Sequence, residues 1–298
     1  MNIIPVSNIL SPEGLNAPTL NALIPNEENY KVLLMQPKGD IEADANGVRN
    51  RNQEIARKQF GQFLDNAHGA DLVVTPEYSM PWKVLSDMIK AGKLPAKGKI
   101  WVLGCESIKY KELEVLKSEL ASYAKVLFES ITPDDRKFLS PLAYVFKAPQ
   151  LNGNTGDKTI ILVQFKTHSM GDPKHFEVNG MQKGTQIYEL KNNNAHSLRL
   201  FSLICADAFA LNDAHADNMY DRSLILHIQL NPEPRHPVFL GCREKLLKYK
   251  GDQTEILCLN WASDAHVWLN GVEAKWKNIS GSAWYLKSFD FDKHDSTL

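Results

Sequence analysis

Three apolar runs constrain the fold of this chain most, because each ends on a residue capable of acid, base or nucleophilic chemistry. They are LVVTPEYSMPW with Glu77, IILVQFKTH with Lys166 and LRLFSLICADAF with Cys205. Each run is short and rich in apolar or β-branched residues, which is typical of a buried strand. In folds that alternate strands and helices, strand ends hold reactive side chains rigidly. We therefore expect the carboxylate, the amine and the thiol to converge.

Composition limits the classes of function. The chain has 298 residues, of which 43% are hydrophobic and 23% charged, and its formal net charge is -1. These values are ordinary for a soluble globular protein and argue against a chain that coats nucleic acid or an anionic membrane. Lysines gather between Lys83 and Lys125, but glutamates interleave with them. We expect a solvated surface there, so nucleic-acid binding is not favoured.

Targeting signals and cysteine pairs are both missing from the sequence. Its start lacks a basic stretch followed by an apolar one, and no apolar run is long enough to span a bilayer. The cysteines at 105, 205, 242 and 258 form no CxxC pair, and the histidines lack metal-ligand spacing. The prediction is a cytoplasmic protein with free thiols and no metal.

Strand and helix patterns alternate along the chain. Residues 1–29 contain several prolines and little periodicity, so we predict an N-terminal extension outside the core. Strands are predicted at 30–36, 72–75, 100–103, 141–146, 159–165, 198–204, 224–230, 255–260 and 282–286. Helices are predicted at 50–68, after Trp82, and at 110–128, 212–221 and 237–250. The alternation predicts an α/β fold with layered sheets and helices.

The three reactive groups together can perform acyl transfer. A free thiol has a pKa of about 8.5, so Cys205 needs a base or a positive charge nearby to act as a nucleophile. Glu77 can accept the thiol proton, while Lys166 and the backbone N–H of Ala206 can stabilise an oxyanion. Attack on an amide would give a thioester, which water then hydrolyses with Glu77 as general acid and base. No metal or organic cofactor is required.

The motifs around these residues resemble those of the nitrilase (carbon–nitrogen hydrolase) superfamily, whose triad is Glu-Lys-Cys in this chain order. VVTPEYS at Glu77 is similar to the first motif of the family, FKTH at Lys166 to the lysine motif, and ICAD at Cys205 to the nucleophile motif. The spacings also lie in the family's usual range. The resemblance covers the chain from Tyr30 to about Leu286.

The resemblance implies a four-layer α-β-β-α sandwich, with residues 30–298 as the carbon–nitrogen hydrolase domain and about 110–128 as an inserted helix. It also implies a homodimer or a larger homo-oligomer. The closing strands usual in the family are not expected after Ser288, and the sequence leaves open the alternative that this chain is part of something larger.

Several further residues are candidates for the site. By the resemblance, Glu177 is a second glutamate that orients Lys166 or binds substrate, with a plain surface charge as the alternative. Residues just after strand ends are weaker candidates for the substrate pocket. These are Tyr78, Trp82, His168, Phe209, Gln229 and Asn231.

The function predicted from the sequence is a thiol-dependent hydrolase of non-peptide C–N bonds, acting on a small amide or N-carbamoyl compound. Two alternatives stay open. One is an acyl or amide transferase, in which an amine or alcohol replaces water at the thioester. The other is a non-catalytic or regulatory module that keeps the fold within a larger assembly. The sequence does not identify the substrate.

Overall fold

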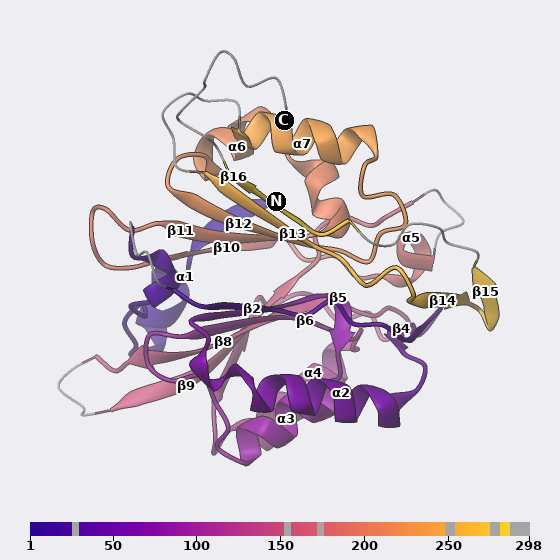
Figure 1. Ribbon diagram of the computed structural model, residues 1–298. Helices are drawn as coiled ribbons and strands as arrows, with labels where there is room; N and C mark the ends of the chain where they lie inside the picture. The colour runs from indigo at the N-terminus through magenta and orange to yellow at the C-terminus, as the bar shows by residue number, and fades with distance from the viewer. Residues whose placement is uncertain (26–29, 152–155, 172–175, 248–253, 275–280, 287–298) are drawn as a thin grey trace.

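Two six-stranded sheets lie face to face in this protein, with helices on both outer faces (Figure 1). The structure is a computed structural model that describes residues 1–25, 30–151, 156–171, 176–247, 254–274 and 281–286. From the bottom of Figure 1 upward, the layers are α2–α4, the first sheet, the second sheet, and α6 with α7. This is the four-layer α-β-β-α sandwich that the sequence predicts.

The two large sheets mix parallel and antiparallel pairs. The first sheet has the order β2-β5-β6-β8-β9-β7, and the second has the order β1-β10-β11-β12-β13-β16. The strands of the first sheet are β2 (Val32–Leu34), β5 (Leu72–Met80), β6 (Ile100–Cys105), β7 (Lys125–Phe128), β8 (Pro141–Pro149) and β9 (Asp157–Phe165). Those of the second sheet are β1 (Asn2–Pro5), β10 (Gln186–Lys191), β11 (Arg199–Ile204), β12 (Ser223–Ile228), β13 (Glu255–Leu259) and β16 (Ala283–Leu286).

Helices and a small third sheet complete the described structure. The helices are α1 (Val6–Leu10), α2 (Gln53–Asp65), α3 (Trp82–Lys90), α4 (Tyr110–Leu120), α5 (Phe176–Gly180), α6 (Asp213–Met219) and α7 (Pro237–Leu247). Short 3₁₀ segments are η1 (Ser11–Glu13), η2 (Asn21–Leu23), η3 (Ala67–Gly69) and η4 (Cys205–Ala210). The small sheet, β15-β14-β3-β4, contains β3 (Asp40–Asp44), β4 (Gly47–Asn50), β14 (His266–Leu269) and β15 (Val272–Ala274).

The alternation of side chains along each strand produces the layers. Leu72 and Val74 of β5 join the apolar cluster between the two sheets, whereas Val73 packs with the helices on the outer face. Strands buried on both faces need apolar residues at every position, not at every second one. This is why the buried strands read as continuous apolar runs in the sequence.

The predicted pairing of 141–146 with 159–165 is confirmed. Strands β8 and β9 form an antiparallel ladder from Pro141 opposite Phe165 to Pro149 opposite Asp157. Residues 152–155 of the intervening turn lie outside the described residues. Most other predicted strands and helices agree with the structure to within a few residues.

The prediction that residues 1–29 lie outside the core is wrong for residues 1–25. Strand β1 pairs in parallel with β10 at the edge of the second sheet. Val6, Leu10 and Leu23 are buried in the cluster between the two sheets. The segment has no periodicity because short elements separated by prolines cover the end of the sandwich. Residues 26–29 lie outside the described residues.

The prediction of one helix over 110–128 is correct only for its first part. Helix α4 ends at Leu120, and β7 then pairs in parallel with β9. Leu127 reaches the core between the sheets, while Tyr123 is exposed. The run KVLF has the composition of a strand. Because Leu127 continues the helical spacing of the apolar residues in α4, the sequence pattern predicted one continuous helix.

The small sheet was not anticipated from the sequence. It joins two local hairpins, β3–β4 and β14–β15, through the pairing of β3 with β14, in which Asp40 lies opposite His266. The predicted loss of closing strands concerns residues 287–298, which lie outside the described residues.

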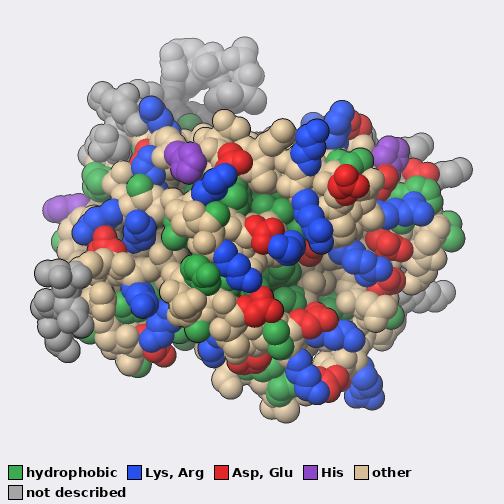
Figure 2. Space-filling view, turned by 90° about the horizontal axis from the view of Figure 1, so that it is seen from below, with side chains coloured by type: hydrophobic (Ala, Val, Ile, Leu, Met, Phe, Trp, Pro, Cys, Tyr) green, Lys and Arg blue, Asp and Glu red, His purple; other side chains and the backbone are tan. Residues whose placement is uncertain are grey.

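The outer face formed by α2–α4 carries mixed charge. Figure 2, seen from below, shows lysine and arginine interspersed with aspartate and glutamate. Lys90 pairs with Glu119 at 3.3 Å, and Lys93 with Asp65 at 2.6 Å. These pairs agree with the predicted solvated surface. In the part of the chain that the structure describes, no helix combines the length and the apolar character needed to cross a bilayer.

Gly104 of β6 allows β5 to bulge toward it. A Cβ atom at this position would lie 2.1 Å from the carbonyl oxygen of Pro76 and 2.8 Å from the Cα of Glu77. We predict that Gly104→Ala lowers the free energy of unfolding by about 2–3 kcal/mol, as overpacking in a rigid core does. Urea unfolding of the variant measures this change.

The matched control for this substitution is Gly61→Ala in α2, where the added Cβ meets nothing within 4 Å. Because glycine in a helix interior costs about 0.5–1 kcal/mol relative to alanine, this variant should be slightly more stable than the parent. Equal stability of the two variants would contradict the close approach at Gly104.

Candidate active site

Glu77 lies in an irregular stretch of β5. The parallel pairing of β5 with β6 runs to Thr75 and resumes only at Met80, with a register shift between. Within this stretch Tyr78 has a φ of 57°, a left-handed conformation that is uncommon for a residue with a side chain. Bulges of this kind redirect side chains near active sites. The side chain of Glu77 is only 2% exposed.

Lys166 directly follows β9, and its ammonium group is fully buried between two carboxylates. Its Nζ lies 2.8 Å from Oε1 of Glu77. It also lies 2.8 Å from Oε1 and 2.9 Å from Oε2 of Glu177. A buried charge is tolerated only when it is paired and hydrogen-bonded. The structure therefore brings three of the predicted residues into direct contact.

Glu177 is buried in α5, so its alternative as a plain surface charge is excluded. Besides Lys166, the Tyr78 hydroxyl donates to Oε1 at 2.7 Å, and the backbone N–H of Met170 donates to Oε2 at 2.6 Å. The Tyr78 hydroxyl thus links the β5 bulge to the second glutamate. This network fixes the position of Lys166 from the side opposite Glu77.

Two donors that the sequence analysis missed hold Glu77. The backbone N–H of Leu230 donates to Oε2 at 3.0 Å, and the indole N–H of Trp261 donates to the backbone carbonyl of Glu77 at 2.8 Å. Trp261 lies just after β13, and none of the motifs quoted above pointed to it. The donor at Leu230 is a backbone N–H, which no sequence pattern identifies.

Cys205 follows β11 and opens η4 with a φ of 43°. A non-glycine residue in this left-handed region stores strain that the surrounding structure must hold, and such residues cluster at active sites. The Cys205 side chain is 1% exposed and, together with Lys166 and Glu177, lines one cavity. Ala206 is fully buried in η4, and its role as an oxyanion donor stays a prediction.

Asp207 ties the Cys205 segment to the Lys166 segment. Its Oδ1 accepts hydrogen bonds from the backbone N–H of Thr167 at 2.7 Å and of His168 at 3.0 Å. Its Oδ2 accepts one from the backbone N–H of Ile204 at 3.0 Å. One buried carboxylate thus connects the residue before Cys205 to the two residues after Lys166.

The two glutamates around Lys166 differ in acidity. Burial raises the pKa of Glu77 to about 7, although the charge of Lys166 opposes this shift. Burial also acts to raise the pKa of Glu177, but there the charge and hydrogen bonds of Lys166 outweigh it, and the pKa lies below its usual range. Glu177 is therefore the fixed counter-ion, and Glu77 is the group that can exchange a proton near neutral pH.

The thiol and the ammonium group keep their protons in the resting site. Burial, and after it the negative charge of Glu77, hold the pKa of Cys205 well above its usual range. Burial acts to lower the pKa of Lys166, but the charges of Glu177 and Glu77 outweigh it and raise the pKa. The site thus combines a neutral thiol, a permanent cation and a carboxylate that titrates near pH 7.

The cavity beside Cys205 has a volume of about 250 Å³. Apart from the charged groups, its described lining is mostly apolar. The lining residues are Tyr78, Lys166, Met170, Gly171, Phe176, Glu177, Cys205, Leu230 and Pro232. Residues 172–175, between two of these, lie outside the described residues.

Of Tyr78 and Trp82, both predicted for the pocket wall, only Tyr78 is found there. Tyr78 lines the cavity. Trp82 does not: its indole N–H donates to the backbone carbonyl of Glu106 at 2.9 Å, and its ring packs with the outer helices. Because Trp82 follows the end of β5 and opens α3, it lies on the outer face of the first sheet.

The four other candidates are not among the residues that line the cavity. The rings of His168 and Phe209 meet edge to face, with centroids 6.2 Å apart. The Gln229 side chain donates to Nδ1 of His227 at 2.9 Å, and the Asn231 side chain donates to Gln229 at 3.3 Å. Gln229 and Asn231 are buried in the segment that follows β12, so they support the site from beneath its surface.

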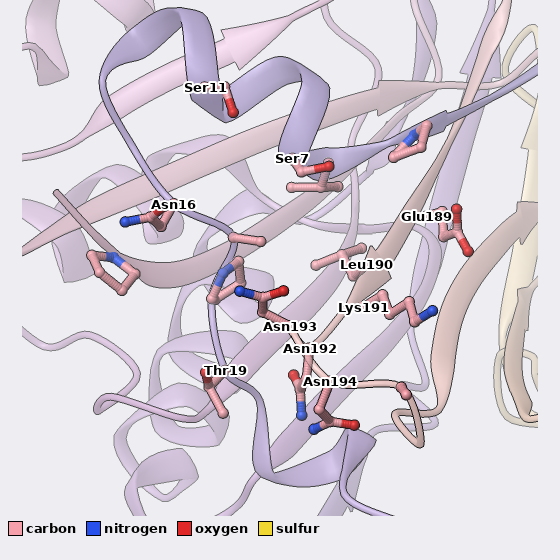
Figure 3. Close-up of a pocket in the computed structure, with 16 residues that line it drawn as sticks. Ser7, Ser11, Asn16, Thr19, Glu189, Leu190, Lys191, Asn192, Asn193 and Asn194 are labelled. Atoms are coloured by element: carbon pink, nitrogen blue, oxygen red, sulfur yellow. The ribbon is translucent and has the colours of Figure 1, made fainter. Parts of the chain in front are cut away.

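A larger hollow, of about 830 Å³, lies away from this cluster (Figure 3). It is bounded by the N-terminal segment and by the turn that follows β10. Figure 3 shows the side chains of Thr19, Asn192, Asn193 and Asn194 around it. None of Glu77, Lys166, Glu177 and Cys205 borders this hollow. Among the described residues, no group of three or more His, Cys, Asp or Glu side chains could hold a metal ion.

Comparison with solved structures finds similar folds at low sequence identity. Glutamine-dependent NAD⁺ synthetase from Acinetobacter baumannii matches with a TM-score of 0.44 and 16% identity, over 89% of this chain and 46% of that one. This chain thus spans about half the length of that synthetase.

Two further matches cover most of both chains. XC1258 from Xanthomonas campestris, described as a CN-hydrolase superfamily protein, matches with a TM-score of 0.47 and 11% identity, over 87% of this chain and 83% of that one. An amidase from Nesterenkonia sp. matches with a TM-score of 0.45 and 14% identity, over 89% and 84%. No family model and no curated protein matches the chain.

We predict that Asp207→Asn separates the two segments that Asp207 connects. An amide has one accepting oxygen, so its NH₂ group must face either the Ile204 N–H or the N–H groups of Thr167 and His168. The free energy of unfolding should fall by about 1.5–3 kcal/mol, the range for hydrogen bonds to a charged group. Chemical denaturation measures the loss.

The control for this substitution is Asp87→Asn, which removes a charge from an exposed pair with Lys83. Exposed ion pairs contribute little to stability, so this variant should unfold like the parent. If Asp207→Asn also unfolded like the parent, Asp207 would not be the link between the two segments.

Proposed function

We propose that this chain is a thiol-dependent hydrolase of the nitrilase (carbon–nitrogen hydrolase) superfamily that acts on the C–N bond of a small amide. One observation carries the proposal. The ammonium of Lys166, fully buried, touches Glu77 and Glu177 and shares a cavity with the thiol of Cys205. A nucleophile and a cation that line one small hollow, with a base hydrogen-bonded to that cation, are the parts that acyl transfer requires.

In the first step, Sγ of Cys205 attacks the carbonyl carbon of the amide. Because the thiol is neutral at rest, Glu77 takes its proton as the S–C bond forms. The carbonyl oxygen becomes an oxyanion, which the Lys166 ammonium and the N–H of Ala206 stabilise. The position of Lys166 between two carboxylates prepares this charge before substrate binds.

In the second step, the tetrahedral intermediate collapses. Glu77 gives its proton to the departing nitrogen, the C–N bond breaks, and a thioester on Cys205 remains. A water molecule then attacks the thioester carbon while Glu77 takes one of its protons. The S–C bond breaks, the proton returns to sulfur, and the carboxylic acid leaves. Glu77 acts twice as base and twice as acid, which suits a pKa of about 7.

The size and lining of the cavity support a small acyl group without charge. About 250 Å³ admits a short acyl chain, and Met170, Phe176 and Leu230 offer it apolar contact. Among the described lining residues, the only cation is Lys166, which is already paired with two carboxylates. An N-carbamoyl amino acid, which carries a carboxylate, is therefore less well supported than a neutral amide.

The test is ammonia release from a panel of propionamide, butyramide, benzamide and an N-carbamoyl amino acid. We expect turnover of one or more neutral amides, and hydroxylamine added to the reaction should trap the acyl group as a hydroxamate. Cys205→Ala should lower the rate at least about 10³-fold, as loss of a nucleophile does. Steady-state assays over the panel measure both effects.

The matched control is Cys242→Ser, which alters another buried cysteine outside the cavity. It should retain the parent's rate. Turnover that survives in Cys205→Ala, or a panel with no substrate at all, would contradict the proposal.

A further inference from the structure

His227 contacts the peptide that follows the proposed nucleophile, and the mechanism above does not use it. The residue lies in β12, and its side chain is 1% exposed. Its Nε2 lies 2.9 Å from the backbone carbonyl oxygen of Cys205. A buried imidazole directed at a backbone atom of the nucleophile needs an explanation beyond packing.

The hydrogen bonds around His227 fix its tautomer. A carbonyl oxygen can only accept, so Nε2 must carry the proton and donate it to Cys205. Nδ1 is then an acceptor, and the side-chain amide of Gln229 donates to it at 2.9 Å. The Asn231 amide in turn donates to Oε1 of Gln229 at 3.3 Å. Donation therefore runs in one direction, from Asn231 through Gln229 and His227 to Cys205.

The Gln229 amide nitrogen also lies 3.2 Å from Nε2, but two N–H donors cannot bond each other, so only its contact with Nδ1 is a hydrogen bond. Sγ of Cys258 lies 4.0 Å from Nδ1, and the ring of Phe239 packs with its centroid 5.4 Å from that of His227. Burial lowers the pKa of His227 to about 4, so the ring stays neutral at physiological pH. The tautomer set by Gln229 is thus maintained.

The carbonyl of Cys205 and the N–H of Ala206 belong to one planar peptide unit and point in opposite directions. Whatever fixes the carbonyl therefore also aims the N–H. This peptide follows a residue with a φ of 43° and lies in a 3₁₀ segment, whose own hydrogen bonds have poor geometry. A side-chain donor on the carbonyl adds the restraint that the segment lacks.

We propose that His227 is a positioning residue that orients and polarises the Cys205–Ala206 peptide, so that its N–H donates to the oxyanion. A donor on the carbonyl draws electron density through the peptide and strengthens the N–H as a donor, as in any hydrogen-bonded chain. Gln229 and Asn231 extend this chain into the buried segment that follows β12. The inference rests on the proposed function, since it assigns a role within the same reaction.

The test compares two reactions of Cys205 in His227→Phe. Hydrolysis of the best amide passes through an oxyanion, whereas alkylation by iodoacetamide displaces iodide from a saturated carbon and forms none. We expect kcat to fall about 10–100-fold, within the effect of weakening one oxyanion donor, while KM and the alkylation rate change less than about threefold. His227→Gln, which retains an N–H donor, should recover part of kcat.

The matched control is His215→Phe. His215 also lies within hydrogen-bond distance of a carbonyl, with Nε2 3.0 Å from the backbone oxygen of Met1, but it does not line the cavity. This variant should keep both rates. If His227→Phe fails to fold, Gln229→Met removes the donor to Nδ1 and should give the same split between kcat and alkylation.

Two results would overturn the inference while leaving the proposed function intact. In one, kcat and alkylation fall together, which indicates a structural role; in the other, neither changes. If the parent hydrolyses no amide, the proposed function fails, and crystal structures of the parent and His227→Phe decide the inference. A rotated Cys205–Ala206 peptide in the variant supports it, and an unchanged peptide overturns it.

Discussion

The site depends on one buried ammonium group held between two carboxylates. Removing an ion from water costs several kcal/mol, so Lys166 can be buried only if its partners are fixed close to it. Glu77 comes from the β5 bulge and Glu177 from α5. Leu230 and Trp261, which follow β12 and β13 of the second sheet, hold Glu77. Residues from both sheets' strand ends and from α5 therefore surround this charge. The left-handed backbone of Tyr78 belongs to the bulge that places Glu77 there.

Chemistry follows from the unequal environments of the two glutamates. Glu177 accepts hydrogen bonds from Lys166, the Tyr78 hydroxyl and the N–H of Met170, which together stabilise its negative charge. Glu77 is buried with weaker compensation, and its pKa rises to about 7. Burial also keeps the Cys205 thiol neutral, so in the proposed reaction proton transfer to Glu77 accompanies nucleophilic attack. In the proposed reaction, Glu177 orients Lys166 and Glu77 moves the protons.

Much of this could be predicted from sequence, because motifs around Glu77, Lys166 and Cys205 are local and the apolar runs define the strands. The predictions that were wrong or missing concern contacts with residues far away in the sequence. Every residue except proline has a backbone N–H, so the residue type does not indicate that Leu230 donates to Glu77. Strand β1 is recognised only by its partner β10, far along the chain. The prediction that Trp82 lines the pocket was wrong because its position after a strand does not determine which face of the sheet its side chain lies on.

The most direct measurement is the rate of Cys205 alkylation by iodoacetamide between pH 5 and 9, followed by mass spectrometry in the parent and in Glu77→Gln. In the parent, Cys205 should react faster than the other three cysteines, and its rate should rise with pH around a midpoint near 7, because Glu77 accepts the proton only when ionised. In Glu77→Gln this midpoint should vanish. A midpoint near 7 that persists in Glu77→Gln, or a Cys205 no more reactive than its buried counterparts, would contradict the account.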